Sequence, residues 1–301
     1  MRSILVTGGT VFVSKYVAEY FASKGDQVYV LNRNTRLQPK NTILLQGDRH
    51  KLGSLLKDCH FDVVVDVTAY TGEDVVDLCA GLGGFDSYIM ISSSAVYPET
   101  NAQPFIEEQP IGDNRFWGEY GTNKVDAEKA LKERVPHAYI LRPPYLYGPM
   151  NNVYRESFVF DCALSGRKFY LPNKGELPLQ FFYIGDLCRM IEVLIQNKPV
   201  KTIYNVGNPE CVTVKEWVEL CYEIAGASCE LVPVHQQINP RAYFCFADYS
   251  YKLDVSEQDK LLSELKPFKE GLREAFLWYQ NHESEVAKRP YLDYIDNHFM
   301  K

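Results

Sequence analysis

The sequence predicts a doubly wound α/β fold, and three observations support this prediction. Short apolar runs of strand length alternate with segments whose apolar residues recur at steps of three and four. The first run, residues 3–6, ends at a tight turn that contains Gly8 and Gly9. The composition is globular, with 46% hydrophobic and 24% charged residues. We therefore expect parallel strands covered by helices on both faces, followed by a smaller and irregular C-terminal part.

In the N-terminal half, each predicted element follows from its local pattern. An apolar stripe from Val13 to Phe21 ends at Lys24-Gly25, which suits a helix C-terminus. The valine-rich run at residues 61–67 is typical of a buried strand. The strands predicted here are 3–6, 27–31, 42–45, 61–67, 87–92 and 138–141, and the helices are 13–24, 51–56 and 120–134.

The C-terminal half is less regular, but one helix start is well marked. Thr213 and Glu216 fit the S/T-x-x-E capping box, which predicts a helix at 213–225. The other elements predicted in this half are a strand at 202–206 and helices at 157–165, 185–196 and 269–282.

The same patterns suggest a division of the chain into two parts. We expect residues 1–148 to form a dinucleotide-binding domain, with later contributions from about 183–206 and 242–255. Residues 149–301 would form mainly the substrate-binding part. The aromatic tail at 291–299 could dock on the body of the protein or on another subunit.

Charge and cysteine usage argue against several classes of protein. The chain has 32 Lys plus Arg and 39 Asp plus Glu, and its net charge of −7 argues against a general nucleic-acid binder. No apolar run reaches the roughly 18 residues that span a bilayer, and the start lacks a signal-peptide core, so we expect a cytoplasmic protein without membrane contact. The eight cysteines include no C-x-x-C pair, so we expect reduced thiols and no metal site.

The turn after the first strand has part of the pattern that binds a dinucleotide diphosphate. In a Rossmann-type first turn, glycines allow the bend, the close approach of backbone to phosphate and tight helix–strand packing. The G-x-x-G-x-x-G frame falls on Gly8, Val11 and Ser14, so Val11 places a β-branched side chain where backbone would approach the diphosphate. A turn that merely joins a strand to a helix is the alternative. The predicted cofactor contacts of this turn are Gly8, Gly9, Thr10, Val11, Phe12 and Val13.

The residues after the second strand favour NADP over NAD. An acidic residue there would bind the ribose hydroxyls of NAD, whereas an arginine accommodates the 2′-phosphate of NADP. The chain has Asn32 and Arg33 at this point, and both are predicted cofactor contacts. The alternative is that Arg33 and Arg36 are ordinary solvated charges.

A candidate catalytic group lies on the helix predicted at 120–134. Tyr120 and Lys124 are one helical turn apart and therefore share a face. A lysine beside a tyrosine lowers the phenol pKa, so that the tyrosine can exchange a proton with a substrate hydroxyl. Ser92-Ser93-Ser94, at the end of a predicted strand, supplies a hydroxyl that could orient that alcohol. Alone, the Tyr–Lys spacing also fits an ordinary helix surface.

The order of these motifs resembles the extended, atypical short-chain dehydrogenase/reductase family, in its NAD(P)-dependent epimerase/dehydratase group. The resemblance spans nearly the whole chain. The matching segments are the turn at Gly8, SSSAVY at 92–97, Tyr120 with Lys124, RPPYLYGP at 142–149, FFYIGDL at 181–187 and YNVGNPE at 204–210.

The resemblance implies roles for further residues. The family's catalytic serine lies four residues before the tyrosine of a V-Y pair, which selects Ser93 with Tyr97 as reference. Asp48 would lie near the adenine and residues 68–70 beneath the cofactor, although either could be turn residues. The resemblance also implies a nucleotide-sugar substrate and a possible homodimer. The remaining predicted contacts are Thr68, Ala69, Tyr70, Ser92 and Pro143 for the cofactor and Ser94, Tyr145, Gln180 and Arg241 for the substrate.

Two functions stay open on the sequence alone. The first is an NADP-preferring oxidoreductase or epimerase that acts on a hydroxyl-bearing substrate. Family dehydratases place Asp-Glu after the catalytic threonine, whereas this chain has Ser94-Ala95, so dehydration ranks low. The second is a nucleotide-binding or RNA-binding protein with little catalysis, because the G-G-T-x-F opening is similar to the branch that includes chloroplast stem-loop RNA-binding proteins.

Overall fold

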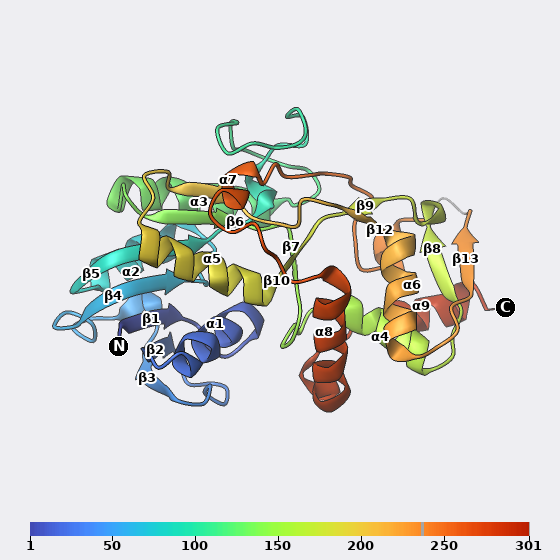
Figure 1. Ribbon diagram of the computed structural model, residues 1–301, viewed down its shortest axis with the longest axis horizontal. Coiled ribbons are helices and arrows are strands. Elements are labelled where there is room, and N and C mark those ends of the chain that lie inside the picture. Colours follow the sequence, from blue (N-terminus) through green and yellow to red (C-terminus); the bar gives the residue numbers. More distant parts are fainter. Residues whose placement is uncertain (236–237, 301) are drawn as a thin grey trace.

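The computed structural model describes residues 1–235 and 238–300, which form two lobes (Figure 1). Within those residues, the larger lobe contains a seven-stranded sheet in the order β11-β6-β5-β4-β1-β2-β3. All neighbouring strands in this sheet are parallel, so the predicted fold class is confirmed. Its strands are β1 (Ser3–Thr7), β2 (Gln27–Asn32), β3 (Thr42–Gln46), β4 (His60–Asp66), β5 (Gly84–Ile91), β6 (Tyr139–Arg142) and β11 (Ile203–Asn205).

Helices cover both faces of the sheet, as the alternation of elements predicts. They are α1 (Phe12–Ser23) and α5 (Ile184–Asn197) on one face and α2 (Gly72–Gly81) and α3 (Glu119–Arg134) on the other. Successive residues of β1 point to opposite sides, so Ile4 and Val6 join the core under α1 and α5. Leu5 joins the separate core under α2 and α3. Burial on both sides explains why the strands are continuously apolar rather than alternating.

Two local predictions in this lobe differ from the structure. The helix predicted at 51–56 is wrong: a short 3-10 helix, Arg49–Lys51, is followed by turns, and Gly53 has a positive φ of 55° that interrupts helical geometry. Helix α2 was not predicted. It begins with a reciprocal capping box between Thr71 and Asp74, in which each side chain accepts a hydrogen bond from the other residue's backbone.

The smaller lobe contains the helices predicted at 157–165, 213–225 and 269–282, whereas the one predicted at 185–196 is α5 of the larger lobe. The Thr213–Glu216 capping box is confirmed at the start of α6. The tail forms an additional helix whose Tyr291 stacks on Tyr154, so it docks on its own chain. The elements of this lobe are α4 (Glu156–Leu164), β8 (Phe169–Pro172), α6 (Val214–Ala225), β13 (Leu231–Val234), α8 (Phe268–His282) and α9 (Tyr291–His298).

Shorter elements connect the two lobes. A third buried cluster joins Tyr251 and Leu253 of the late chain to Val96 and Phe105, beside the end of β5. None of the described helices is long and apolar enough to cross a membrane. The remaining elements are β7 (Tyr145–Tyr147), β9 (Pro178–Leu179), β10 (Phe181–Tyr183), β12 (Val212–Thr213) and α7 (Ser256–Asp259), with 3-10 helices at Ser94–Val96, Asn173–Gly175, Pro240–Ala242 and Glu283–Glu285.

Candidate active site

The turn between β1 and α1 requires its two glycines. Gly8 and Gly9 have φ values of 86° and 85°, in the region that other residues rarely adopt. A Cβ at Gly9 would lie 2.5 Å from Cγ1 of Val30, and one at Gly8 would lie 2.9 Å from Cγ2 of Thr68. The backbone therefore lies close against neighbouring strands. Val11, the N-cap residue of α1, provides no side-chain cap, so the first N–H groups of the helix have no side-chain acceptor at that position.

Val11 and Ser14 stand where the glycine pattern has glycine, but their side chains do not fill the space in front of this turn. The Ser14 hydroxyl donates to the Val11 carbonyl over 2.9 Å, which links the two positions. Both residues line a cavity of about 500 Å³. The unfilled helix N-terminus and the tight glycine turn fit the diphosphate of a dinucleotide. Other predicted cofactor contacts that line this cavity are Gly8, Thr10, Phe12, Val13, Thr68, Tyr70, Ser92, Pro143 and Lys124.

A second cavity, of about 400 Å³, adjoins the first at the ends of β2 and β3. Arg33 and Arg36 are exposed on its rim, and Asp48 lies in its wall, where its side chain accepts from the backbone N–H of His50. Asn32 also lines it, but the side chain donates to the Gly8 carbonyl over 2.7 Å and so braces the glycine turn. We call this the adenosine-side cavity, after the part of a dinucleotide that it would hold.

Arg49 was not identified from the sequence as a site residue. It lines the adenosine-side cavity, and its guanidinium donates to the Asp66 carboxylate over 2.8 Å and to the Thr68 carbonyl over 2.6 Å. Asp66 is fully buried and also accepts from the hydroxyls of Thr7 and Tyr88. This ion pair fixes the ends of β1 and β4 under the cofactor cavity. The aspartate lies 17 residues away in the sequence, so spacing alone gives no signal for the pair.

Tyr120 and Ser93 lie together, as predicted. Both line the large cavity and a third one, of about 350 Å³, that extends into the smaller lobe. Loss of solvent around the phenol raises the pKa of Tyr120, and a hydrogen bond with Ser93 and the charge of Arg155 oppose the rise. The Ser93 hydroxyl also accepts from the backbone N–H of Ala95 over 3.2 Å, which holds it in place.

Lys124 lines the large cavity and is held there by backbone carbonyls. Its ammonium is buried and donates to the carbonyls of Ala69 and Ile91 over 2.8 and 2.9 Å, at the ends of β4 and β5. Burial lowers the pKa of Lys124 to about 8. Desolvation is the largest influence on the pKa of Tyr120, and the expected lowering of that pKa by Lys124 stays a prediction.

Ser92 belongs to a buried network behind the reaction centre. Its hydroxyl donates to Glu128 over 2.6 Å, and Glu128 accepts two hydrogen bonds from the Arg142 guanidinium. Arg142 also donates to the Tyr97 hydroxyl over 2.7 Å. The network satisfies both charges in a nearly dry environment and ties α3 to β6. Ser92 thus supports the strand end that presents Ser93.

The cavity in the smaller lobe, which we call the substrate-side cavity, contains three of the four predicted substrate contacts. Ser94 donates to the Tyr251 hydroxyl, and Tyr145 and Arg241 also line the wall. The prediction for Gln180 is corrected: its buried amide bonds to the backbone of Leu253 and Asn208 instead of facing the cavity. The amide N–H groups of Gln180 donate to the carbonyls of Asn208 and Leu253, and its oxygen accepts from the Leu253 N–H, so the side chain holds these two segments together.

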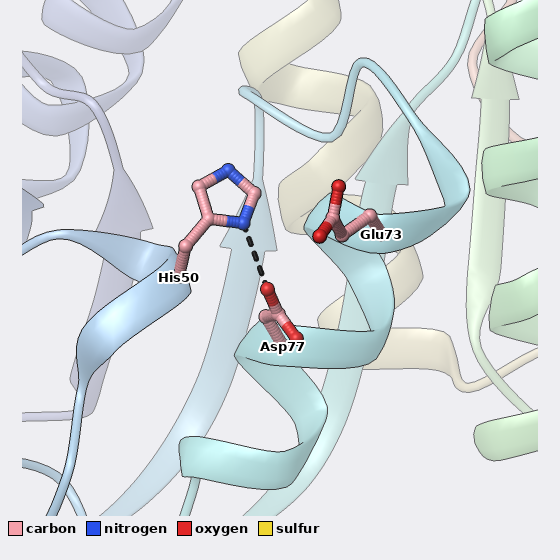
Figure 2. A group of neighbouring side chains, drawn as sticks. All are labelled: His50, Glu73 and Asp77. Atoms are coloured by element: carbon pink, nitrogen blue, oxygen red, sulfur yellow. Dashed lines mark hydrogen bonds and ion pairs between the residues drawn. The ribbon is translucent and has the colours of Figure 1, made fainter.

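His50, Glu73 and Asp77 come within 4.8 Å of one another on the surface of α2 and the adjoining turn (Figure 2). The sequence gave no metal-ligand spacing for these residues. His50 Nδ1 lies 2.8 Å from Asp77 and Nε2 lies 3.3 Å from Asp74. The hydrogen bond with Asp77 raises the pKa of His50, which favours an imidazolium between two carboxylates. His50 is already paired with Asp77 and Asp74, and we assign no metal to this exposed group.

Comparisons with known proteins agree with the fold and the motifs. Residues 68–207 match the NAD dependent epimerase/dehydratase family. The chain is 26% identical over 304 residues to the chloroplast stem-loop binding protein of 41 kDa b of Arabidopsis thaliana, covering 91% of this chain and 78% of that protein. It is 28% identical over 227 residues to the probable GDP-L-fucose synthase 1 of Oryza sativa subsp. japonica, covering 68% and 66%.

The same fold occurs in a solved UDP-glucose 4-epimerase of Thermotoga maritima, determined with UDP-glucose. The TM-score is 0.75 at 19% identity, with 93% of this chain and 99% of that one covered. The parallel sheet with helices on both faces is a Rossmann-type fold. The central part of the chain, residues 68–207, is similar to the NAD dependent epimerase/dehydratase family, in line with the motifs in the sequence.

Proposed function

We propose that the protein is an NAD(P)-dependent oxidoreductase or epimerase that acts on a hydroxyl group of a nucleotide sugar. One observation carries the proposal: Ser93 and Tyr120 line both the cavity at the glycine turn and the substrate-side cavity. They therefore lie where a cofactor and a substrate would meet. The names of the rice relative and the Thermotoga structure support a nucleotide sugar as the substrate class.

In this proposal each residue has a distinct task. A bound nicotinamide cofactor supplies the hydride acceptor or donor. Tyr120 exchanges a proton with the substrate oxygen. In the protein alone its raised pKa keeps the phenol protonated, so it starts as the proton donor. Ser93 orients the same oxygen. Lys124 fixes the ends of β4 and β5 and keeps a positive charge beside the cavity.

We further propose that the cofactor is NADP. The support is the pair of exposed arginines, Arg33 and Arg36, on the rim of the adenosine-side cavity. A guanidinium there can pair with a 2′-phosphate. Asp48, in the same wall, would accept a hydrogen bond from the adenine.

The test is the activity of Tyr120→Phe with a panel of UDP-hexoses and either dinucleotide, followed by product analysis. The variant should lose about 10²- to 10⁴-fold in kcat, which is the usual contribution of a proton-transfer group. Tyr29→Phe, on strand β2 and outside the lining of the three cavities, is the control and should keep full activity. Activity of Tyr120→Phe within a few-fold of the wild type would remove the mechanism.

A second candidate is a binding protein with little catalysis. The Arabidopsis relative, named as a stem-loop binding protein, favours it. Calorimetry with NADP and NAD separates the two candidates. Failure of both dinucleotides to bind at millimolar concentration, together with binding of a stem-loop RNA, would favour the second.

A further inference from the structure

Arg155 lies between the reaction centre and the substrate-side cavity, directly before α4. It lines both the large cavity and the substrate-side cavity, as do Ser93 and Tyr120. Its guanidinium carbon lies 5.6 Å from the ring centre of Tyr145, which positions the group over an aromatic face. The sequence gave no motif for this arginine.

Among the described residues, no side chain or backbone group pairs with the guanidinium of Arg155. Its Nε is buried and has no hydrogen-bond acceptor within residues 1–235 and 238–300. No described carboxylate lies within ion-pair distance, and the adjacent Glu156 accepts from Asn151 instead. A buried charged donor without an acceptor is costly, so such groups normally have a partner. Arg49, in the adenosine-side cavity, and Arg142, buried behind the reaction centre, each pair with a carboxylate.

The surroundings favour an anion as the missing partner. The described lining of the substrate-side cavity contains two arginines and several aromatic rings but no Asp or Glu. Arg241 lines only this cavity and already donates to the Cys245 carbonyl. Arg155 also borders the large cavity, and its charge lowers the pKa of Tyr120. An anion bound by Arg155 would therefore lie in a cavity that Tyr120 also lines.

We propose that Arg155 binds a carboxylate of the substrate, carried on the sugar close to the hydroxyl that reacts. A guanidinium matches a carboxylate through two parallel hydrogen bonds. The diphosphate of a nucleotide sugar is attached at the opposite, nucleotide side of the sugar. The favoured substrate is then a nucleotide-linked uronic acid, and this assignment rests on the proposed function.

The experiment compares UDP-glucuronate with UDP-glucose, which differ at one carbon. Both are titrated calorimetrically into the full-length protein saturated with NADP. We expect UDP-glucuronate to bind the wild type about tenfold or more tightly, because UDP-glucose leaves the guanidinium without an acceptor. In Arg155→Gln the ratio should fall to within about twofold, and Arg155→Lys should be intermediate because it keeps the charge but loses the planar fork.

The control is Arg273→Gln, which removes the same charge from an exposed position on α8 and should keep the wild-type ratio. Equal affinities in the wild type, no binding of UDP-glucuronate, or an unchanged ratio in Arg155→Gln would overturn the proposal. Competition by inorganic phosphate but not by acetate would also overturn the choice of a carboxylate. This experiment measures binding and not activity. If Tyr120→Phe kept normal activity, the proposed function would be removed, but the affinity ratio of the two UDP-sugars would still test the role of Arg155.

Discussion

Two arginines at opposite ends of the cleft show how differently its halves are built. At the adenosine side, Arg49 donates to the Asp66 carboxylate and to the backbone of Thr68 and Asp74. At the substrate side, Arg155 has a buried Nε without an acceptor in the described chain. The same side chain is part of the scaffold in one half and is available to a ligand in the other. Whether an arginine is paired with other protein groups therefore indicates its role, structural or ligand-binding, better than the residue type does.

The polar side chains around them follow the same division. Asn32 braces the glycine turn, and Lys124 bridges the ends of two strands. Ser93 and Tyr120, by contrast, face cavities with few protein partners. The adenosine half depends on internal bonds for its shape, whereas the substrate half keeps its polar groups for binding and chemistry.

The largest expected effect is on stability at Arg49. Arg49→Met should lower the free energy of unfolding by about 3–5 kcal/mol, because it leaves the buried Asp66 without its counter-ion. Arg155→Met should change it by no more than about 1 kcal/mol, since no protein partner is lost. Urea denaturation measures both. Equal losses in the two variants would break the contrast between the two halves.

The next effect is a pH dependence at Lys124. Its folded-state pKa of about 8 lies below the ordinary value of 10.5, so the unfolded chain binds more protons between these two pH values. The free energy of unfolding should therefore rise with pH across this window, by up to about 3 kcal/mol, and this contribution should be constant below pH 8. Lys124→Met should lack this rise. Parallel pH profiles for the wild type and the variant would contradict the lowered pKa.

A smaller effect is expected at the glycine turn. Gly9 and Gly25 have almost the same positive φ, 85° and 86°, but a Cβ at Gly25 meets no atom within 4 Å. Gly9→Ala should therefore destabilise the protein by about 1–3 kcal/mol more than Gly25→Ala, through the clash with Val30. Thermal unfolding gives the difference. Adding Val30→Ala should recover part of the stability lost in Gly9→Ala. If no stability were recovered, the loss would come from the strained backbone and not from the clash with Val30.

The smallest expected effect concerns cofactor choice. Arg33→Ala should weaken NADP binding about tenfold and leave NAD binding unchanged, because a single exposed charge pair with the 2′-phosphate is lost. Titration with both dinucleotides measures this ratio, and Lys57→Ala, away from this rim, serves as control. A wild type that binds NAD more tightly would contradict the NADP proposal.

Local sequence patterns were sufficient for much of the fold. The strand and helix alternation, the glycine turn and the Thr213–Glu216 capping box all involve residues close in the chain. The helix predicted at 51–56 was wrong because Leu52 and Leu56 are buried although the chain forms turns there. Apolar residues four apart are compatible with both structures, so their spacing alone does not distinguish a helix from turns. Gln180 was misjudged because its backbone partners include Leu253, which lies 73 residues away.

The sequence by itself determined the parallel sheet, the glycine turn and the placing of Tyr120 and Lys124 on one face of a helix. These features depend on periodicity and on backbone geometry over a few residues. Only the tertiary structure decided that Lys124 bonds to carbonyls, that Arg49 is paired and that Arg155 is not. Desolvation and pairing depend on groups brought together from distant parts of the chain, and they decide whether a charged side chain supports the fold or binds a ligand.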